Sequence, residues 1–270
     1  MKIRALTISI LLTFSAAVLT AAESGSPQIV VNPLTDRVIP QVVDGASWST
    51  GFALTSLETS KTIYWTLEFF SDQGAVDAFN IAGSGAGSKF QGFLDANNST
   101  FFETAGTGDV LNQGWALIKT YDRPFTDPAA TLTNDRIGAI AVFRQRIAGR
   151  PDFEAAVPLS PINETRFTMP FSNQNGFSTG IAVLNPDRNN RAAVEVLIYP
   201  RTGDFVRQDA FLLEPGSKLV FSLPDRYSES RGISGSIHVR TTNGAALSAL
   251  GLRFNPGGAF TSTPPLSVAP

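Results

Sequence analysis

The sequence predicts an all-β protein built from two tandem β-sandwich domains, and three observations indicate this. Apolar and polar residues alternate with a period of two, most clearly in residues 63–69 (IYWTLEF), as expected for a strand with one buried face. Turn-forming residues recur about every 8–12 residues, and a helical period of 3.6 is almost absent. One stretch also occurs twice, as residues 48–54 (WSTGFAL) and residues 177–183 (FSTGIAV).

The repeated stretch predicts an internal duplication. The offset of 129 residues between Trp48 and Phe177 also relates Arg37 to Arg166. It continues through residues 63–69 and the following turn, so that Gly74 matches Gly203 at the same offset. A slip of one residue would turn every side chain to the opposite face of its strand. The shared register therefore indicates that the two halves are built alike.

Later stretches match at smaller offsets, which locates insertions in the first half. The pairs are Ser99 with Ser217 (118), Gly114 with Gly235 (121), Ala139 with Ala249 (110) and Phe153 with Phe260 (107). The two large drops predict inserted loops near residues 81–98 and 121–135. Both stretches are rich in Gly, Asn, Asp, Thr or Pro, as exposed loops usually are.

The N-terminus reads as a secretory signal. Lys2 and Arg4 precede an almost wholly apolar run at residues 5–19, and small residues allow cleavage after Ala22. We therefore expect a signal peptide at 1–22, a leader at 23–35, a first sandwich domain at 36–160 and a second at 161–267. The predicted location is outside the cytoplasm, meaning extracellular, periplasmic or cell-surface, with no transmembrane segment once the signal is removed.

The charge and composition limit the classes of binding partner that can be expected. Without Lys2 and Arg4 the chain has 19 basic and 23 acidic residues, a net charge of −4, and it shows no basic run. Nucleic acid and anionic membranes need clustered Lys and Arg, so neither is expected as a partner. The expected partner is therefore a surface protein or a polysaccharide. The chain has no cysteine, so its stability has to come from packing and strand ladders.

No catalytic constellation is evident. His238 is the only histidine and lies at a polar position of an alternating stretch, residues 236–240 (SIHVR), where an exposed strand residue is expected. The Gly-rich residues 83–89 lack the order Gly-Lys-Ser/Thr of a phosphate loop. Oxygen-rich residues 185–190 and 122–135 lack the acidic ladder of known calcium loops. Acidic side chains that a glycosidase would need in pairs show no selective spacing: Asp72, Asp77, Asp95, Glu103 and Asp109. We therefore expect no enzyme activity, no cofactor and no metal.

Aromatic residues are the remaining candidates for ligand binding, because aromatic rings on a sheet can stack on sugar rings or form a protein interface. Tyr64, Phe70 and Tyr199 lie in the phase opposite to the predicted core, and Phe90 and Phe93 lie in the first predicted insertion. An alternative interpretation is that Phe70 and Tyr199 cover the turn ends or the domain junction.

Two motifs carry a resemblance to a known group of proteins. These are [WF]-S-T-G at Trp48 and Phe177 and F-x-x-x-x-P-L-S at Phe153 and Phe260. With the strand pattern, they resemble the tandem immunoglobulin-like repeats of uncharacterised secreted bacterial proteins. The resemblance implies antiparallel immunoglobulin-like sandwiches. The expected function is a non-catalytic secreted or cell-surface module with a structural, adhesion or binding role. A carbohydrate-binding module that uses outward aromatics is the alternative, and a secreted hydrolase is a remote one.

Overall fold

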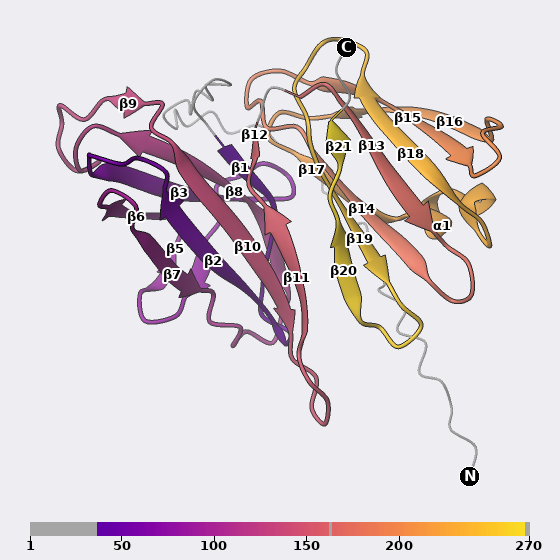
Figure 1. The fold of residues 1–270 in the computed structure, drawn as a ribbon, viewed down its shortest axis with the longest axis horizontal. Coiled ribbons are helices and arrows are strands. Elements are labelled where there is room, and N and C mark those ends of the chain that lie inside the picture. Colours follow the sequence, from indigo (N-terminus) through magenta and orange to yellow (C-terminus); the bar gives the residue numbers. More distant parts are fainter. Residues whose placement is uncertain (1–36, 162–163, 268–270) are drawn as a thin grey trace, which may run out of the picture.

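The computed structural model describes residues 37–161 and 164–267, and within them the protein is all-β (Figure 1). The predicted signal peptide and leader lie outside the described residues. The helical segments of the described part are short, namely α1 (Leu223–Arg226) and a 3-10 turn at Ser228–Ser230. In this part of the chain no helix has the length and apolar character needed to cross a membrane.

The first half, residues 37–161, forms two antiparallel sheets. Sheet A1 has the order β12 (Ser160–Pro161), β1 (Arg37–Asp44), β8 (Asn112–Tyr121), β3 (Ile63–Ser71) and β6 (Lys89–Leu94), with β9 (Leu132–Thr133) beside β8. Sheet B1 has the order β11 (Phe153–Pro158), β10 (Ile137–Gln145), β2 (Trp48–Ser56) and β7 (Ser99–Glu103). A small hairpin, β4 (Phe79–Ile81) and β5 (Gly85–Gly87), lies outside both sheets.

The second half, residues 164–267, repeats this strand order. Sheet A2 runs β21 (Leu266–Ser267), β13 (Arg166–Ser172), β18 (Ser234–Thr241), β15 (Ala192–Pro200) and β16 (Arg207–Leu213). Sheet B2 runs β20 (Phe260–Thr263), β19 (Ser248–Phe254), β14 (Ser178–Leu184) and β17 (Lys218–Ser222). Taken strand by strand along the chain, each sheet of the second half therefore has a counterpart in the first.

The ladders of the two halves also agree in register. Leu54 pairs with Ala139 across β2 and β10, and Val183 pairs with Ala249 across β14 and β19. These pairs have the sequence offsets of 129 and 110 residues given above. Neighbouring backbones also come equally close at equivalent glycines of the two halves. A Cβ added to Gly114 would lie 2.0 Å from the Phe70 carbonyl oxygen. A Cβ added to the equivalent Gly235 would lie 1.9 Å from the carbonyl oxygen of Tyr199.

The first predicted insertion, near residues 81–98, extends too far along the chain, because residues 89–94 are the edge strand β6 and not part of a loop. Phe90 of β6 pairs with Leu67, as Asp209 of β16 pairs with Val196. The extra residues of the first half instead precede β6 and include the β4–β5 hairpin. Glycines on both sides of Phe90 obscured its alternation. One of them, Gly92, faces the Trp65 ring so closely that a Cβ there would lie 2.6 Å from it.

The strand order differs from that of an immunoglobulin domain. There the first strand joins the sheet of the second strand, and the last strand joins the sheet of the third. Here β1 lies beside β8 in sheet A1, and β10 lies beside β2 in sheet B1. The architecture is thus that of packed antiparallel sheets, with these two strands in exchanged positions.

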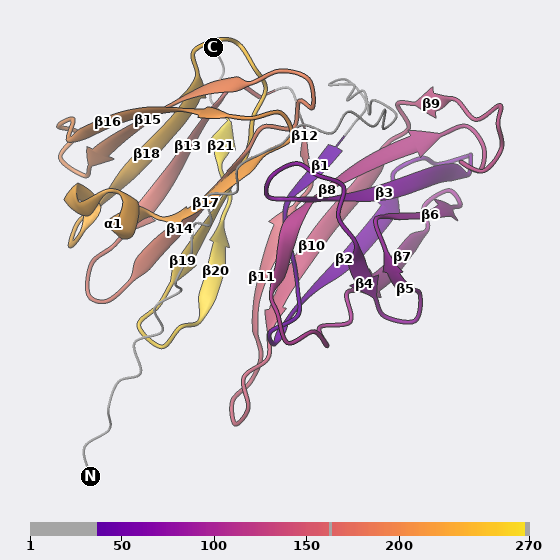
Figure 2. The same cartoon turned by 180° about the vertical axis from the view of Figure 1, so that it is seen from behind.

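Alternating apolar residues fill the space between the sheets of each half. One cluster lies between A1 and B1 and another between A2 and B2. The first cluster continues into the second half through Ala182, Leu250 and Phe260. At this seam β11 and β20 run side by side (Figures 1 and 2), and the Trp48 and Phe260 rings stack with centroids 5.2 Å apart. The two halves therefore share part of one core.

Candidate binding site

Part of the outer face of sheet A1 is buried under the second half. Phe70 and Trp115 lie on neighbouring strands with ring centroids 4.4 Å apart, and both are 0% exposed. The indole Nε1 of Trp115 donates a hydrogen bond of 2.9 Å to the Gly216 carbonyl oxygen, and the Arg188 guanidinium lies 4.3 Å from the centre of the Phe70 ring. Phe70, predicted to be a ligand contact, therefore presents no surface to a ligand, and the alternative of a junction residue describes its position.

A buried lysine fastens the same junction. The ammonium of Lys218 in β17 donates to the Gly114 carbonyl oxygen at 2.5 Å and to the side-chain oxygen of Gln41. It also forms an ion pair with Asp72 at 3.0 Å. Burial lowers the pKa of Lys218, while the negative charge of Asp72 opposes this shift. Three first-half groups thus satisfy one charge from the second half, which fixes how the halves meet.

The matching face of sheet A2 is open. Tyr199 pairs with Ser236 across β15 and β18, as Phe70 pairs with Trp115 across β3 and β8. The other half does not cover this pair, and the Phe205 ring packs edge to face on Tyr199 with centroids 5.8 Å apart. Instead a groove with a volume of about 540 Å³ opens here, lined by Phe171, Tyr199, Pro200, Arg201, Gly203, Ser234, Gly235, Ser236 and His238. Its volume lies in the range of small-ligand sites.

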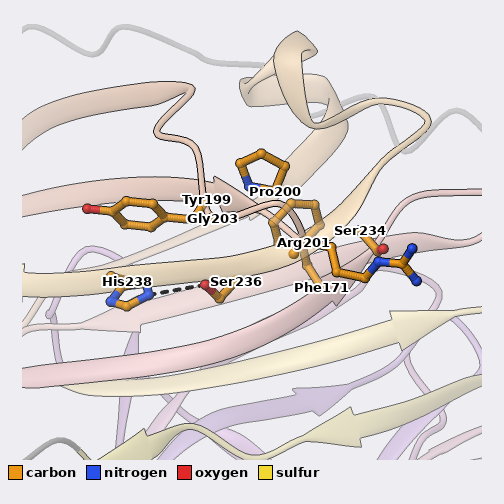
Figure 3. A pocket seen from close by; sticks show the side chains of 9 residues that line it. Phe171, Tyr199, Pro200, Arg201, Gly203, Ser234, Ser236 and His238 are labelled. Atoms are coloured by element: carbon orange, nitrogen blue, oxygen red, sulfur yellow. Dashed lines mark hydrogen bonds between the residues drawn. The ribbon is translucent and has the colours of Figure 1, made fainter.

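His238 occupies one end of the groove and bonds to two hydroxyl groups. Its Nε2 lies 3.1 Å from the Ser236 hydroxyl and its Nδ1 3.3 Å from the Thr168 hydroxyl. The Tyr199 ring meets the imidazole edge to face with centroids 4.9 Å apart. Figure 3 shows these two rings at one end of the groove and the Arg201 and Ser234 side chains at the other. An aromatic face and several hydrogen-bonding groups therefore line the same hollow.

The electrostatics favour a neutral imidazole. Partial burial lowers the pKa of His238, and the positive charge of Arg166 lowers this pKa further. A smaller hollow of about 280 Å³ continues past His238 along β13 and β18, where Arg166 and Arg240 line it. Arg240 forms an ion pair with Glu195, whose other oxygen accepts a hydrogen bond of 2.6 Å from Gln208. The charge of Arg240 is thus balanced within the sheet.

The arrangement around His238 suits binding better than acyl transfer. A serine hydrolase needs a carboxylate that orients the histidine from the nitrogen opposite the serine. Here that nitrogen meets the hydroxyl of Thr168. Within residues 37–161 and 164–267, no three His, Asp or Glu side chains come together in a way that would hold a metal ion.

The oxygen-rich loops use their carboxylates for local turns. The Asp187 carboxylate accepts backbone hydrogen bonds from Asn189 at 2.7 Å and from Asn190 at 3.1 Å. The carboxylate of Asp122 accepts one from Thr131 at 2.8 Å. This is the ordinary role of Asp in turns.

The remaining predicted ligand residues fall elsewhere. Tyr64 and Phe93 face each other across β3 and β6 with centroids 6.4 Å apart, and Phe93 is 62% exposed. Phe90 packs edge to face on Phe69 at 5.9 Å and lies against the core. Only Tyr199 of the five predicted residues therefore lies in the groove, and the structure does not bring it together with the other four.

His238, Ser234, Ser236 and Arg201 are groove residues that the sequence did not single out as a site. His238 was expected only as an exposed strand residue. The missing information was the pairing of β15 with β18, which brings Tyr199 beside Ser236. Applying the offsets of 129 and 121 residues to Phe70 and Trp115 leads to these two positions and could have found the site.

No family model matches this chain, and no curated protein sequence matches it. Among solved structures, vicilin from Capsicum annuum is similar to it with a TM-score of 0.23 and 9% identity, over 87% of this chain and 76% of that one. The M60 catalytic domain with the CBM51-1 and CBM51-2 domains from Clostridium perfringens ZmpB gives a TM-score of 0.18 and 10% identity, over 84% of this chain and 33% of that one. Both TM-scores are too low to indicate a shared fold, and we transfer no residue or role from either protein.

Proposed function

We propose that this chain is an exported, non-catalytic binding module, built from two duplicated sandwich domains that are fused into one rigid body. Its ligand site is the Tyr199–His238 groove on sheet A2, and its ligand is a surface polysaccharide or another sugar-bearing polymer. The observation that carries this proposal is the open groove at positions whose counterparts in the first half are buried.

The duplication is supported by the equal strand orders and by the matching ladders, such as Leu54 with Ala139 and Val183 with Ala249. Each unit is immunoglobulin-like in that two antiparallel sheets pack face to face, although β1 and β10, like their counterparts β13 and β19, lie in the opposite sheets from the first and last strands of an immunoglobulin domain. Export is supported by the basic, apolar and small-residue pattern of residues 1–22.

The choice of a sugar follows from the groove's chemistry. The Tyr199 ring offers a flat apolar surface, on which the C–H face of a sugar ring can stack. Ser234, Ser236 and His238 surround it with groups that both donate and accept hydrogen bonds, as sugar hydroxyls require.

A glycan array tests this proposal. The wild-type chain should bind at least one polysaccharide, and Tyr199→Ala should weaken that binding about fivefold or more, since stacking on an aromatic ring contributes on the order of 1 kcal/mol or more. Tyr64→Ala is the matched control, because it removes an aromatic ring from the first half and should leave binding unchanged.

The outcomes separate the alternatives. Binding that depends on Tyr64 and not on Tyr199 would place the site on sheet A1 and refute the groove. If the chain binds no glycan on the array, the proposal of a sugar ligand is wrong. Hydrolysis of a bound glycan, measured as released reducing ends, would contradict the non-catalytic role.

A further inference from the structure

The outer face of sheet B1 is apolar and open, unlike most exposed sheet faces. Five positions on three adjacent strands form its apolar part: Gly51 and Ala53 of β2, Phe101 of β7, and Ile140 and Val142 of β10. Glu103 of β7 lies on the same face, opposite Gly51. Phe101 is 76% exposed and Ile140 48% exposed. Contiguous apolar surface of this kind usually marks a protein interaction site.

The matching face of sheet B2 is buried against protein. Ala53 lies between Phe101 and Ile140 across the strands of B1. Its counterpart Ala182 lies between Val220 and Leu250 in the same way. Ala182 and Leu250 are buried in the core that the second half shares with the first. In this chain, therefore, the surface that covers such a face is a β-sandwich of the same chain.

The open face carries a knob next to a hole. A Cβ placed on Gly51 would meet only the Val142 carbonyl oxygen, at 3.9 Å, so the space above Gly51 is empty. The large ring of Phe101 projects from the adjacent strand. At the equivalent Gly180 the space is filled by the Phe254 ring, which approaches within 3.1 Å of a Cβ placed there. That ring belongs to the neighbouring strand β19 of the same sheet, and it shows that the space over this glycine can hold an aromatic ring.

The charges at one end of the open face are already paired. Arg144 of β10 forms an ion pair with Glu154 at 2.8 Å and another with Glu103 at 3.5 Å. Since burying an unpaired charge is costly, this pairing removes an obstacle to covering the face. A partner does not need to bring a counter-charge.

We propose that this face binds a second copy of the same chain. The two faces meet around a two-fold axis, so that Phe101 of each copy lies over Gly51 and Ala53 of the other. A knob and a hole on one face are self-complementary under two-fold symmetry, which is the commonest symmetry of protein dimers. The interface leaves the Tyr199–His238 groove free and does not depend on the function proposed for it.

The dimer is expected to be weak. Three strands about 4.8 Å apart and roughly six residues long give a face on the order of 15 Å by 20 Å. Each copy therefore buries less than the roughly 800 Å² that a stable interface needs. We expect a dissociation constant on the order of 1–100 µM.

Sedimentation velocity of the full chain, from about 5 to 500 µM, tests the proposal. The wild type should shift from monomer to dimer over this range. Phe101→Asp should abolish the shift, and Gly51→Val should do the same by filling the hole with a residue that suits a strand. Leu212→Asp is the matched control, because Leu212 is 59% exposed on the edge strand β16 of the other half. It should dimerise as the wild type does.

Melting temperatures of all four proteins establish that each is folded. A wild type that stays monomeric at every concentration overturns the proposal and leaves the face to a different partner. A dimer that survives either Phe101→Asp or Gly51→Val also overturns it, because the contact then lies on another surface. Loss of the dimer in Leu212→Asp would likewise refute the assignment to sheet B1.

Discussion

Two equivalent residue pairs differ in burial. Phe70–Trp115 in the first half and Tyr199–Ser236 in the second lie on equivalent strands in the same register, yet the first pair is buried and the second is open. Phe70 and Trp115 lie under Gly216 and Arg188 of the second half. Tyr199 and Ser236 line a groove. The comparison shows that the docking of the halves, and not the sandwich itself, decides which face is available for a ligand.

Truncating the buried aromatic should give the largest effect. Trp115→Ala removes a fully buried indole and its hydrogen bond to Gly216, and we expect a loss of about 3–5 kcal/mol in the free energy of unfolding. The equivalent Ser236→Ala removes only the hydrogen bond to His238 in the open groove and should lower it by about 1 kcal/mol or less. Urea denaturation of both variants measures the difference. Similar losses in the two would show that the faces are equally covered.

Breaking the buried ion pair should come next in size. Asp72→Asn leaves the ammonium of Lys218 buried without a counter-charge, and we expect a loss of about 3 kcal/mol. Adding Lys218→Met to this variant removes the unpaired charge and should restore about 2 kcal/mol. Denaturation of the single and double variants checks this. If the double variant is no more stable than Asp72→Asn, the ion pair does not hold the junction in the way described.

The smallest effect concerns the titration of the groove. Burial and Arg166 hold the pKa of His238 below 6.5. Between that lowered pKa and 6.5 the unfolded chain binds more protons than the folded chain, so stability falls as the pH is lowered through this window. Proton NMR of a protein without a histidine tag gives the pKa directly, since the chain has one histidine. Arg166→Gln should raise this pKa. Titration of the wild type at or above 6.5 would contradict the partly buried, neutral imidazole.

Much of the fold could be predicted from the sequence, because strand alternation and register are local properties. Residues 63–69 do form a strand, β3, although both of its faces are buried from Trp65 to Phe70 and not one as predicted. The offsets that relate Leu54 to Val183 and Ala139 to Ala249 are those of the paired strands. Strand β6 was missed because Gly92 interrupts its alternation of apolar and polar residues. The exchanged positions of β1 and β10 depend on long-range pairing that local pattern does not encode.

The site was harder to predict than the fold. Phe70 and Tyr199 are both aromatic and both stand in the outward phase, so nothing in their own strands tells the buried residue from the open one. The residue on the neighbouring strand makes the difference. The large apolar ring of Trp115 favours a buried position beside Phe70, whereas the small polar Ser236 beside Tyr199 does not. Reading that signal requires knowing that β3 pairs with β8, and β15 with β18.

Differential scanning calorimetry of the wild-type chain tests most directly whether the two halves form one rigid body, in which the outer face of sheet A1 is covered and that of sheet A2 is open. A shared core through Ala182 and Leu250, together with the buried ammonium of Lys218, predicts one cooperative transition whose calorimetric and van't Hoff enthalpies agree. Two separate transitions in the wild type would mean that the halves unfold independently, and would contradict the account.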